Sequence, residues 1–301
     1  MADRFKELQC FLALRQFGNF TRAAEAMGMS QPSLSAIISN FEEDLGLLLF
    51  DRTTRSVEMT AAGERLYPRA AQIVNDLADA LDGMRATSSL ATGSVKIAAL
   101  PSVCSGVLPQ ALNVFHKSHP KIEVNFSEVL AGPMAEMVAS GECEFAIGVD
   151  FPTHAELEFG VILSDEMLLI CAQDHRFSAE TSLPWEALSG EPMVSMGSMT
   201  SIHGLIKSVC ADHDINLKIA HTALFLATAF GLVREGLGVS VMPRSLLVDF
   251  NMKGIAAIPL HTPQVMRHVG IIQRRSRSLS PAAIGLAKVI RDVAAQNEVA
   301  P

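Results

Sequence analysis

Short hydrogen-bonding side chains gather between residues 30 and 45 of the 301-residue chain. On a helix, one face of this segment would present donors and acceptors from Gln31, Ser33, Ser35, Ser39 and Asn40. Such side chains can pair with base edges in the major groove of DNA. Proline is tolerated in the first turn of a helix, so Pro32 fits the start of the segment. We expect double-stranded DNA to be contacted by Gln31, Pro32, Ser33, Ser35 and Ser39.

Three arginines beside this segment can bind phosphates. Arg22 precedes it, and Arg52 and Arg55 follow it in a short basic stretch. Guanidinium groups contact phosphate oxygens or enter the narrow minor groove of A·T-rich DNA. The favourable charge is only local, because residues 1–58 hold six Lys or Arg and eight Asp or Glu, and the whole chain has a net charge of −8. The sequence therefore limits the expected phosphate contacts to these three arginines.

Two short helices and a hairpin must position these side chains. Thr21 is the predicted N-cap of a first helix that Gly28 ends, and Ser30 is the predicted N-cap of a second. The second helix carries an apolar stripe at helical spacing, formed by Leu34, Ile37, Ile38, Phe41 and Leu45. Residues 47–50 and 57–60 predict two strands around a basic tip, as in the wing of a winged helix. Without this wing, a surface helix pair with solvated Ser and Gln side chains would explain the pattern equally well.

The order of these residues resembles the LysR-type transcriptional regulator family. The resemblance rests on Phe17, Ala23, Ala24, the run from Ser30 to Ser35, Ile38, Glu42, Leu45, Gly46, Leu49, Phe50, Arg52, Thr60 and Gly63. It implies an α/β protein with an N-terminal winged helix-turn-helix, a dimerising linker helix and a C-terminal effector-binding domain. That domain is two-lobed and built like a type II periplasmic binding protein. Many members carry Arg or Lys in the middle of the recognition helix, where this chain has Ala36 and Ser39.

The predicted boundaries follow the composition. Residues 1–59 form the winged helix-turn-helix, residues 60–86 one long helix, and residues 87–93 a small, polar hinge. The long helix has apolar residues alternating by four and three, namely Leu66, Ala70, Ile73, Leu77, Ala80 and Met84. This spacing predicts a seam between two copies, hence a homodimer, and the resemblance implies that a homotetramer is possible. The alternative is that the helix packs on its own domain.

From residue 94 to 301, predicted strands and helices alternate. Strands are expected at residues 95–100, 121–127, 145–149, 167–172, 193–195, 239–242 and 269–272. Two sublobes fit this order best. The resemblance implies sublobe I at residues 94–163 and 266–301, and sublobe II at residues 164–265.

Ligands of two-lobed α/β domains bind between the lobes, at strand ends and helix N-termini. Predicted strands run into Pro101-Ser102 and into residues 196–201, where hydroxyls and free N–H groups could cradle a carboxylate. The alternative is that these hydroxyls cap their own helices. With positions implied by the resemblance, the expected effector site comprises Ser102, Ala131, Ser198, Met199, Thr200, Ser201, Phe225 and Ala227. We expect a small, partly hydrophobic organic acid, held by hydroxyls and amides because no arginine is evident to clamp it.

Other kinds of site find little support. The chain lacks a GxSxG, an HExxH or a Gly-rich phosphate loop, and the HxxH of His116 and His119 has no obvious third metal ligand. Five scattered cysteines without a CxxC pair predict reduced thiols. No apolar run of 18 residues and no apolar N-terminal signal region occur. We expect a cytoplasmic protein with no catalytic residues, cofactor, metal or membrane partner.

Two classes of function remain. The first is a sequence-specific DNA-binding transcriptional regulator controlled by a small-molecule effector. The second is a cytosolic small-molecule-binding protein or enzyme on the two-lobed fold, whose N-terminal module serves only assembly. The intact wing favours the first.

Overall fold

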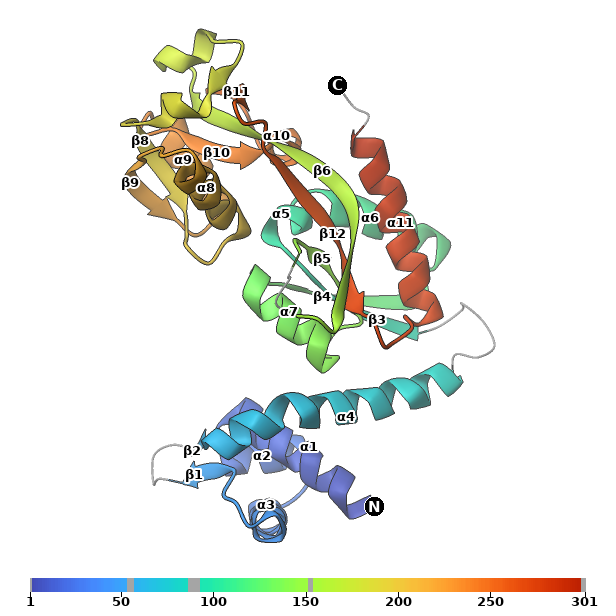
Figure 1. Ribbon diagram of the computed structural model, residues 1–301. Coiled ribbons are helices and arrows are strands. Elements are labelled where there is room, and N and C mark those ends of the chain that lie inside the picture. The colour runs from blue at the N-terminus through green and yellow to red at the C-terminus, as the bar shows by residue number, and fades with distance from the viewer. Residues whose placement is uncertain (1, 53–56, 86–92, 151–153, 299–301) are drawn as a thin grey trace. The chain divides into compact units, whose positions relative to one another are not determined.

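The computed structural model describes residues 2–52, 57–85, 93–150 and 154–298 (Figure 1). The chain divides into an N-terminal unit, chiefly residues 1–89, and a C-terminal unit, chiefly residues 90–301. Among the helices within these ranges, none is both long and apolar enough to cross a membrane.

The N-terminal unit is a helical module with a hairpin. Its elements are α1 (Ala2–Phe17), α2 (Phe20–Ala26), α3 (Gln31–Leu45), β1 (Phe50–Arg52), β2 (Val57–Met59) and α4 (Ala61–Arg85). The antiparallel hairpin pairs Phe50 with Met59. Its core combines Phe11 and Leu14 of α1 with Leu34 and Ile38 of α3, all fully buried. Burying one face of α3 leaves its polar face outside this core.

Both ends of α3 follow from local chemistry. Ser30 caps it as predicted, since its Oγ accepts a hydrogen bond from the Ser33 N–H at 3.3 Å. Gly46 ends it with a φ of 65°, a left-handed conformation that glycine adopts without strain. The predicted cap at Thr21 is wrong. Asn19 caps α2 instead, because its Oδ1 accepts from the N–H groups of Thr21 (2.9 Å) and Arg22 (3.1 Å).

The apolar stripe and the first wing strand end differently from the prediction. Leu34, Ile38 and Phe41 are buried, but Leu45 is 43% exposed. The first strand begins only at Phe50, and Leu47 and Leu48 before it are exposed. Of the four consecutive apolar residues at 47–50, the first two therefore lie in a short exposed connection, and Leu49 and Phe50 are buried where the strand begins.

The long helix predicted from residue 60 onward is present as α4. Leu66 and Ala70 pack into the core of the N-terminal unit, so these two members of the predicted seam are used internally. Ile73 and Leu77 are 53% and 41% exposed. The side chains of Ala80 and Met84, and the predicted hinge before Gly93, lie outside the described part of the chain.

The C-terminal unit is built on two sheets. The larger has the order β4-β3-β5-β12-β6-β11-β7, with β10 also paired to β6, and the smaller pairs β8 with β9. The strands are β3 (Gly93–Ala99), β4 (Ile122–Glu128), β5 (Phe145–Gly148), β6 (Leu157–Ala172), β7 (Leu183–Pro184), β8 (Pro192–Met196), β9 (Lys218–Ala223), β10 (Ser240–Pro243), β11 (Ile255–His261) and β12 (Met266–Arg274).

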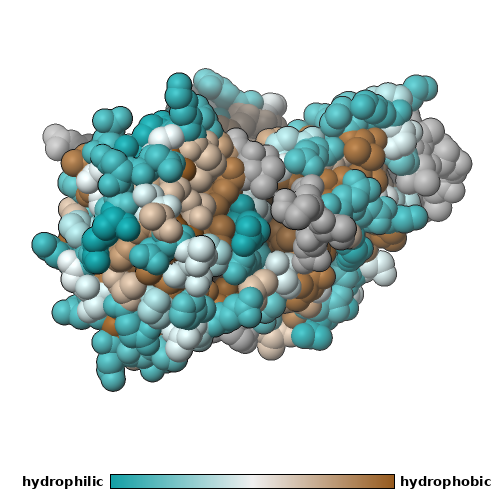
Figure 2. Space-filling view, turned by 90° about the horizontal axis from the view of Figure 1, so that it is seen from above, coloured by the Kyte–Doolittle hydropathy of each residue, from teal (hydrophilic) through white to brown (hydrophobic). Residues whose placement is uncertain are grey.

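Helices flank these sheets (Figure 1). They are α5 (Pro101–Cys104), α6 (Val107–Ser118), α7 (Ala131–Ser140), α8 (Ser201–Asp212), α9 (Leu226–Arg234), α10 (Arg244–Asp249) and α11 (Pro281–Glu298), with the 3-10 turns η1 (Arg176–Ala179) and η2 (Trp185–Leu188). On the face shown in Figure 2, brown hydrophobic surface is interspersed with teal hydrophilic side chains.

One long strand, β6, runs through both halves of this unit, and β12 pairs with part of it. Where the sequence predicts a strand only at residues 167–172, β6 is one continuous strand of 16 residues. It pairs antiparallel with β12 from Glu166 opposite Met266 to Leu157 opposite Arg274. Figure 1 shows the two strands side by side, from the β3–β5 region to the β10–β11 region. The first half of β6 was missed because it is only partly buried and lacks a continuous apolar run.

Candidate nucleic-acid and ligand sites

The start of α3 presents the predicted polar face. Gln31, Pro32 and Ser33 are exposed, as is Ser39 two turns later, and Ser35 is partly buried. The hydroxyl of Ser33 lies 2.8 Å from that of Ser30, so it also takes part in the cap. Gln31, Ser35 and Ser39 follow one another at intervals of four residues and so lie along one side of α3, which could face the edges of base pairs.

A buried carboxylate fixes α3 to the hairpin. Glu42 is 5% exposed, and its Oε1 accepts hydrogen bonds from the N–H groups of Leu49 (2.8 Å) and Phe50 (3.1 Å). The hydroxyl of Thr60 donates to the Leu48 carbonyl at 2.7 Å and accepts from the Gly63 N–H at 3.1 Å. This role of Glu42 has no direct signal in the sequence, because its partners are backbone groups seven and eight residues away.

The predicted phosphate-binding arginines differ in how far the structure describes them. Arg22 is exposed on α2, with its guanidinium carbon 5.8 Å from the ring centroid of Phe17. The backbone of Arg52 ends β1 opposite Val57. The side chain of Arg52 and the whole of Arg55 lie outside the described residues.

In each of the two sheets, a parallel strand pair brings two of the predicted ligand-binding segments side by side. Val129 N donates to the Ala99 carbonyl at 3.0 Å, so the chain toward Ser102 and the chain toward Ala131 leave the same edge of the large sheet. In the small sheet Met196 lies opposite Ala223, which places residues 198–201 beside residues 225–227. All eight predicted positions therefore lie at strand ends or helix starts.

Exposure and capping separate these residues further. Met199 and Phe225 are 65% and 69% exposed, and Ser198 and Ala227 are also exposed. Thr200 caps α8, because its hydroxyl accepts from the His203 N–H at 3.2 Å and donates to the Gly197 carbonyl at 2.8 Å. For the Thr200 hydroxyl, the capping alternative is the one that the structure shows.

An arginine that the sequence analysis overlooked joins two of the predicted serines. Arg267, at the start of β12, is 4% exposed, and its Nη2 donates to the hydroxyls of Ser102 (3.0 Å) and Ser201 (3.1 Å). The expectation that no arginine is available is therefore wrong. The strand was predicted to begin only at residue 269, so Arg267 was not placed on it.

Burial dominates the electrostatics around this arginine. It lowers the pKa of Arg267 to about 10, and the nearby carboxylate of Asp165 opposes this shift. Burial also raises the pKa of Asp165, which lies opposite Arg267 in the β6–β12 ladder. Asp165 accepts hydrogen bonds from the Ser245 N–H at 3.0 Å and from the Ser245 hydroxyl.

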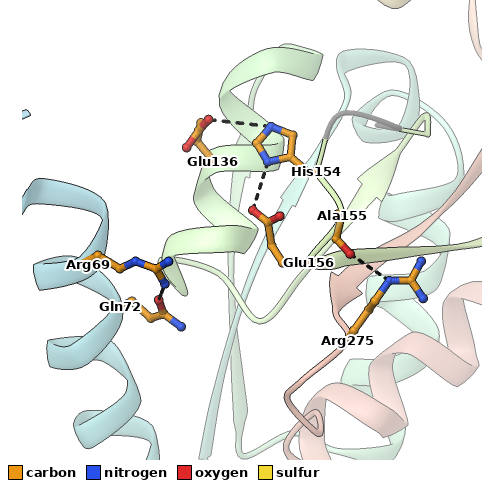
Figure 3. Close-up of polar contacts among 7 residues, drawn as sticks. All are labelled: Arg69, Gln72, Glu136, His154, Ala155, Glu156 and Arg275. Carbon is orange, nitrogen blue, oxygen red and sulfur yellow. Dashed lines mark hydrogen bonds and ion pairs between the residues drawn. The ribbon is translucent and has the colours of Figure 1, made fainter. Parts of the chain in front are cut away.

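A separate polar cavity of about 260 Å³ contains none of the predicted residues. Its lining includes Asp150, His154, Glu158 and Arg275. In Figure 3, His154 lies between Glu136 and Glu156, at N–O distances of 3.8 and 3.4 Å, while Arg275 Nε donates to the Ala155 carbonyl at 3.1 Å.

Metal and thiol chemistry find no centre in the described part of the chain. No group of three or more His, Cys, Asp or Glu there could hold a metal ion. None of the five cysteines, all of which lie in the described part of the chain, forms a disulfide. Burial raises the pKa of the Cys104 thiol to about 12 and that of Cys171 to about 11, which keeps both protonated at neutral pH.

Family models match nearly the whole chain. The model described as "Bacterial regulatory helix-turn-helix protein, lysR family" matches residues 5–64, and "LysR substrate binding domain" matches residues 88–295. The uncharacterized HTH-type transcriptional regulator YbhD of Escherichia coli (strain K12) is 31% identical over 283 residues, which cover 94% of this chain and 89% of that protein.

Solved structures show the same fold. Full-length OxyR from Pseudomonas aeruginosa, in a variant form, has a TM-score of 0.75 and 23% identity, covering 96% of this chain and 94% of that one. Full-length CbnR in complex with its target DNA has a TM-score of 0.68 and 21% identity, covering 96% and 99%. The predicted fold class is confirmed, and the matched relatives are transcriptional regulators rather than enzymes. The chain belongs to the LysR family of DNA-binding transcriptional regulators with an effector-binding domain.

Proposed function

We propose that α3 is the helix that reads the operator sequence. The supporting observation is its exposed polar surface, held to the hairpin by the buried carboxylate of Glu42. In this proposal Gln31, Pro32, Ser33, Ser35 and Ser39 face base edges, and Arg22, Arg52 and Arg55 bind phosphates.

A gel-shift comparison tests this assignment. Gln31→Ala should weaken binding to a duplex from the protein's own promoter region by about 1–3 kcal/mol and leave random duplexes nearly unaffected, because base contacts carry sequence preference. Arg22→Ala is the matched comparison, since loss of a phosphate contact weakens binding to all sequences and reduces its salt dependence. Equal weakening of promoter and random duplexes by Gln31→Ala would show that α3 is not the reader.

For the C-terminal unit we propose an effector site between sublobe I (residues 94–163 and 266–301) and sublobe II (residues 164–265). The hydrogen bonds from Arg267 to Ser102 and Ser201 support it, because they join residues from both sublobes. Ala131, Ser198, Met199, Thr200, Phe225 and Ala227 would complete its walls, with Thr200 acting through the cap of α8. The proposed effector is a small organic acid with an apolar part that contacts Met199 and Phe225.

We further propose that the protein acts in the cytoplasm as a homodimer, or as a homotetramer built from two such dimers. LysR regulators form oligomers, and here Ile73 and Leu77 leave an apolar surface on α4 for a second copy. Two DNA-binding modules in one assembly would compensate for the net negative charge of each, because linked sites bind with a high effective concentration.

A further inference from the structure

Three leucines at the end of α3 are exposed on the N-terminal unit. Leu45, Leu47 and Leu48 are 43%, 54% and 63% exposed, and all three lie within four consecutive residues. Apolar side chains that are scattered singly are ordinary on a protein surface, whereas a cluster of them marks an interaction site. The leucine loop, residues 45–48, joins α3 to β1 (Figure 1) and therefore carries an apolar surface that does not belong to the core of this unit.

The backbone of the leucine loop is held in place from both sides. Leu47 N donates to the Glu42 carbonyl at 3.2 Å, and the Leu48 carbonyl accepts from the hydroxyl of Thr60 at 2.7 Å. The next residue, Leu49, donates its N–H to the buried carboxylate of Glu42. A surface that is already ordered loses little conformational entropy when a partner binds to it. The exposed leucines are therefore preorganised for binding.

A groove of about 530 Å³ lies beside the leucine loop. Its lining consists of Ser39, Glu42 and Glu43 of α3 together with Gly46, Leu47 and Leu48. Apolar grooves of this kind accept the apolar side of a helix from another protein, whose anchoring residues recur at positions i, i+3, i+4 and i+7. The groove and the exposed leucines together therefore fit an amphipathic helix.

The charge around this groove is negative. Glu43 and Asp44 are exposed, and Glu43 forms no ion pair among the described residues, whereas Asp44 pairs with Arg4 at 3.0 Å. The carbonyl groups at the C-terminus of α3 add a partial negative charge. These charges repel DNA phosphates, so this end of α3 stays clear of the duplex, and Ser39 marks the border with the side proposed to read DNA. They also favour a lysine or arginine on the partner.

We propose that the groove docks a short helix of another protein. Apolar residues of this helix contact Leu47 and Leu48, and a lysine or arginine beside them pairs with Glu43. Such a contact adds a protein partner to the proposed function and would let the DNA-bound regulator hold that partner at the promoter. A second copy of the chain fits less well, because a two-fold contact would bring Glu43 and Asp44 against the same acidic groups of the other copy.

Selection of displayed peptides on the full-length protein tests this proposal. A phage-displayed library of random peptides is selected on the parent protein and counter-selected on the double variant Leu47→Ser/Leu48→Ser. The enriched peptides should carry apolar residues at i, i+3, i+4 and i+7 with Lys or Arg beside them. In fluorescence anisotropy the double variant should bind such a peptide at least about tenfold more weakly, because the buried leucine contacts are lost. Glu43→Lys should weaken binding about fivefold, because it reverses one exposed charge pair.

Matched substitutions elsewhere separate this groove from general effects of surface composition. Ile284→Ser removes an exposed apolar side chain from α11, and Glu180→Lys reverses an exposed charge after η1. Neither should change peptide binding. Because Leu47, Leu48 and Glu43 are exposed, their variants should keep the Tm of the parent protein and its gel shift with promoter DNA.

Several outcomes would overturn the inference. They are a selection in which no peptide distinguishes the parent protein from the double variant, and enriched peptides that are acidic or lack helical spacing. Loss of promoter binding in the double variant would assign the leucines to the DNA interface instead. A smaller assembly of that variant in sedimentation velocity would assign the groove to a second copy of the chain.

Discussion

The polar surface of α3 and the site around Arg267 are constructed in opposite ways. On α3 the side chains proposed to contact DNA come from nine consecutive residues, are mostly exposed, and include no cation. Around Arg267 the side chains of the proposed effector site come from segments 165 residues apart, and the central group is a buried cation. A change on the helix surface therefore alters one contact at a time, whereas a change near Arg267 alters the balance of charge for the whole site.

The largest expected effect comes from disrupting the α4 seam between two copies. It tests whether the N-terminal unit dimerises through Ile73 and Leu77. Ile73→Glu together with Leu77→Glu should convert the oligomer to monomers, because burying two unpaired carboxylates in a seam costs several kcal/mol. Sedimentation velocity measures this change. Arg69→Glu alters the net charge equally from outside the seam, where Arg69 donates to Gln72 at 3.2 Å (Figure 3), and should leave the oligomer intact. An unchanged sedimentation coefficient in the double variant would argue against this seam.

Glu42 tests whether the exposed surface of α3 depends on a buried group. Glu42→Ala should lower the free energy of unfolding of the N-terminal unit by about 2–4 kcal/mol, because two buried N–H groups lose their acceptor. Chemical denaturation followed by circular dichroism measures this loss. Glu43→Ala, an exposed neighbour on the same helix, should cost less than about 0.5 kcal/mol. Similar values for the two variants would show that the hairpin is held by its other contacts.

Capping and ligand contact can be separated within the C-terminal unit. Thr200→Ala should lower stability by about 1 kcal/mol, because it removes the N-cap of α8, whereas Thr200→Ser should restore most of it. Ser102→Ala should also lower stability, by about 1–3 kcal/mol, because Nη2 of the buried Arg267 loses an acceptor. Only Ser102→Ala should reduce the rise in Tm caused by a small organic acid such as benzoate. A reduced response to the acid in Thr200→Ala but not in Ser102→Ala would mean that the Thr200 hydroxyl contacts the ligand instead.

Asp165 gives the smallest effect and shows how burial tunes the site. Its pKa is raised in the folded protein, so ionisation costs folding free energy as pH rises from its ordinary value of about 3.9 through the folded value. Relative to Asp165→Asn, the parent protein should therefore lose stability as pH rises through this window and keep a constant difference above it. Urea unfolding between pH 4 and 8 measures the difference. A difference that moves in the other direction would show that the contacts with Arg267 and Ser245 outweigh burial.

The two sites also differ in how well the sequence predicts them. The position of α3 could be read from Ser30, Gly46 and the apolar spacing, since all three act within a few residues of the helix. Glu42 and Arg267 could not be read in this way, because each acts on groups that only the folded chain brings near. The cap at Thr21 was misjudged for a local reason: Asn19 is an equally good cap and lies two residues earlier.

The β6–β12 ladder has a mechanical consequence for the C-terminal unit. Strand β6 runs without a loop from the part paired with β12 to the part paired with β10 and β11, so any swing of one half must twist or bend this strand. The register of the β6–β12 ladder shifts between Val269 and Gly270, where the backbones approach so closely that a Cβ on Gly270 would lie 2.5 Å from the Gly160 carbonyl oxygen. Such an irregularity bends and twists a strand locally. Arg267 is two residues from that shift, so a ligand at the proposed effector site would act beside the place where the ladder already bends.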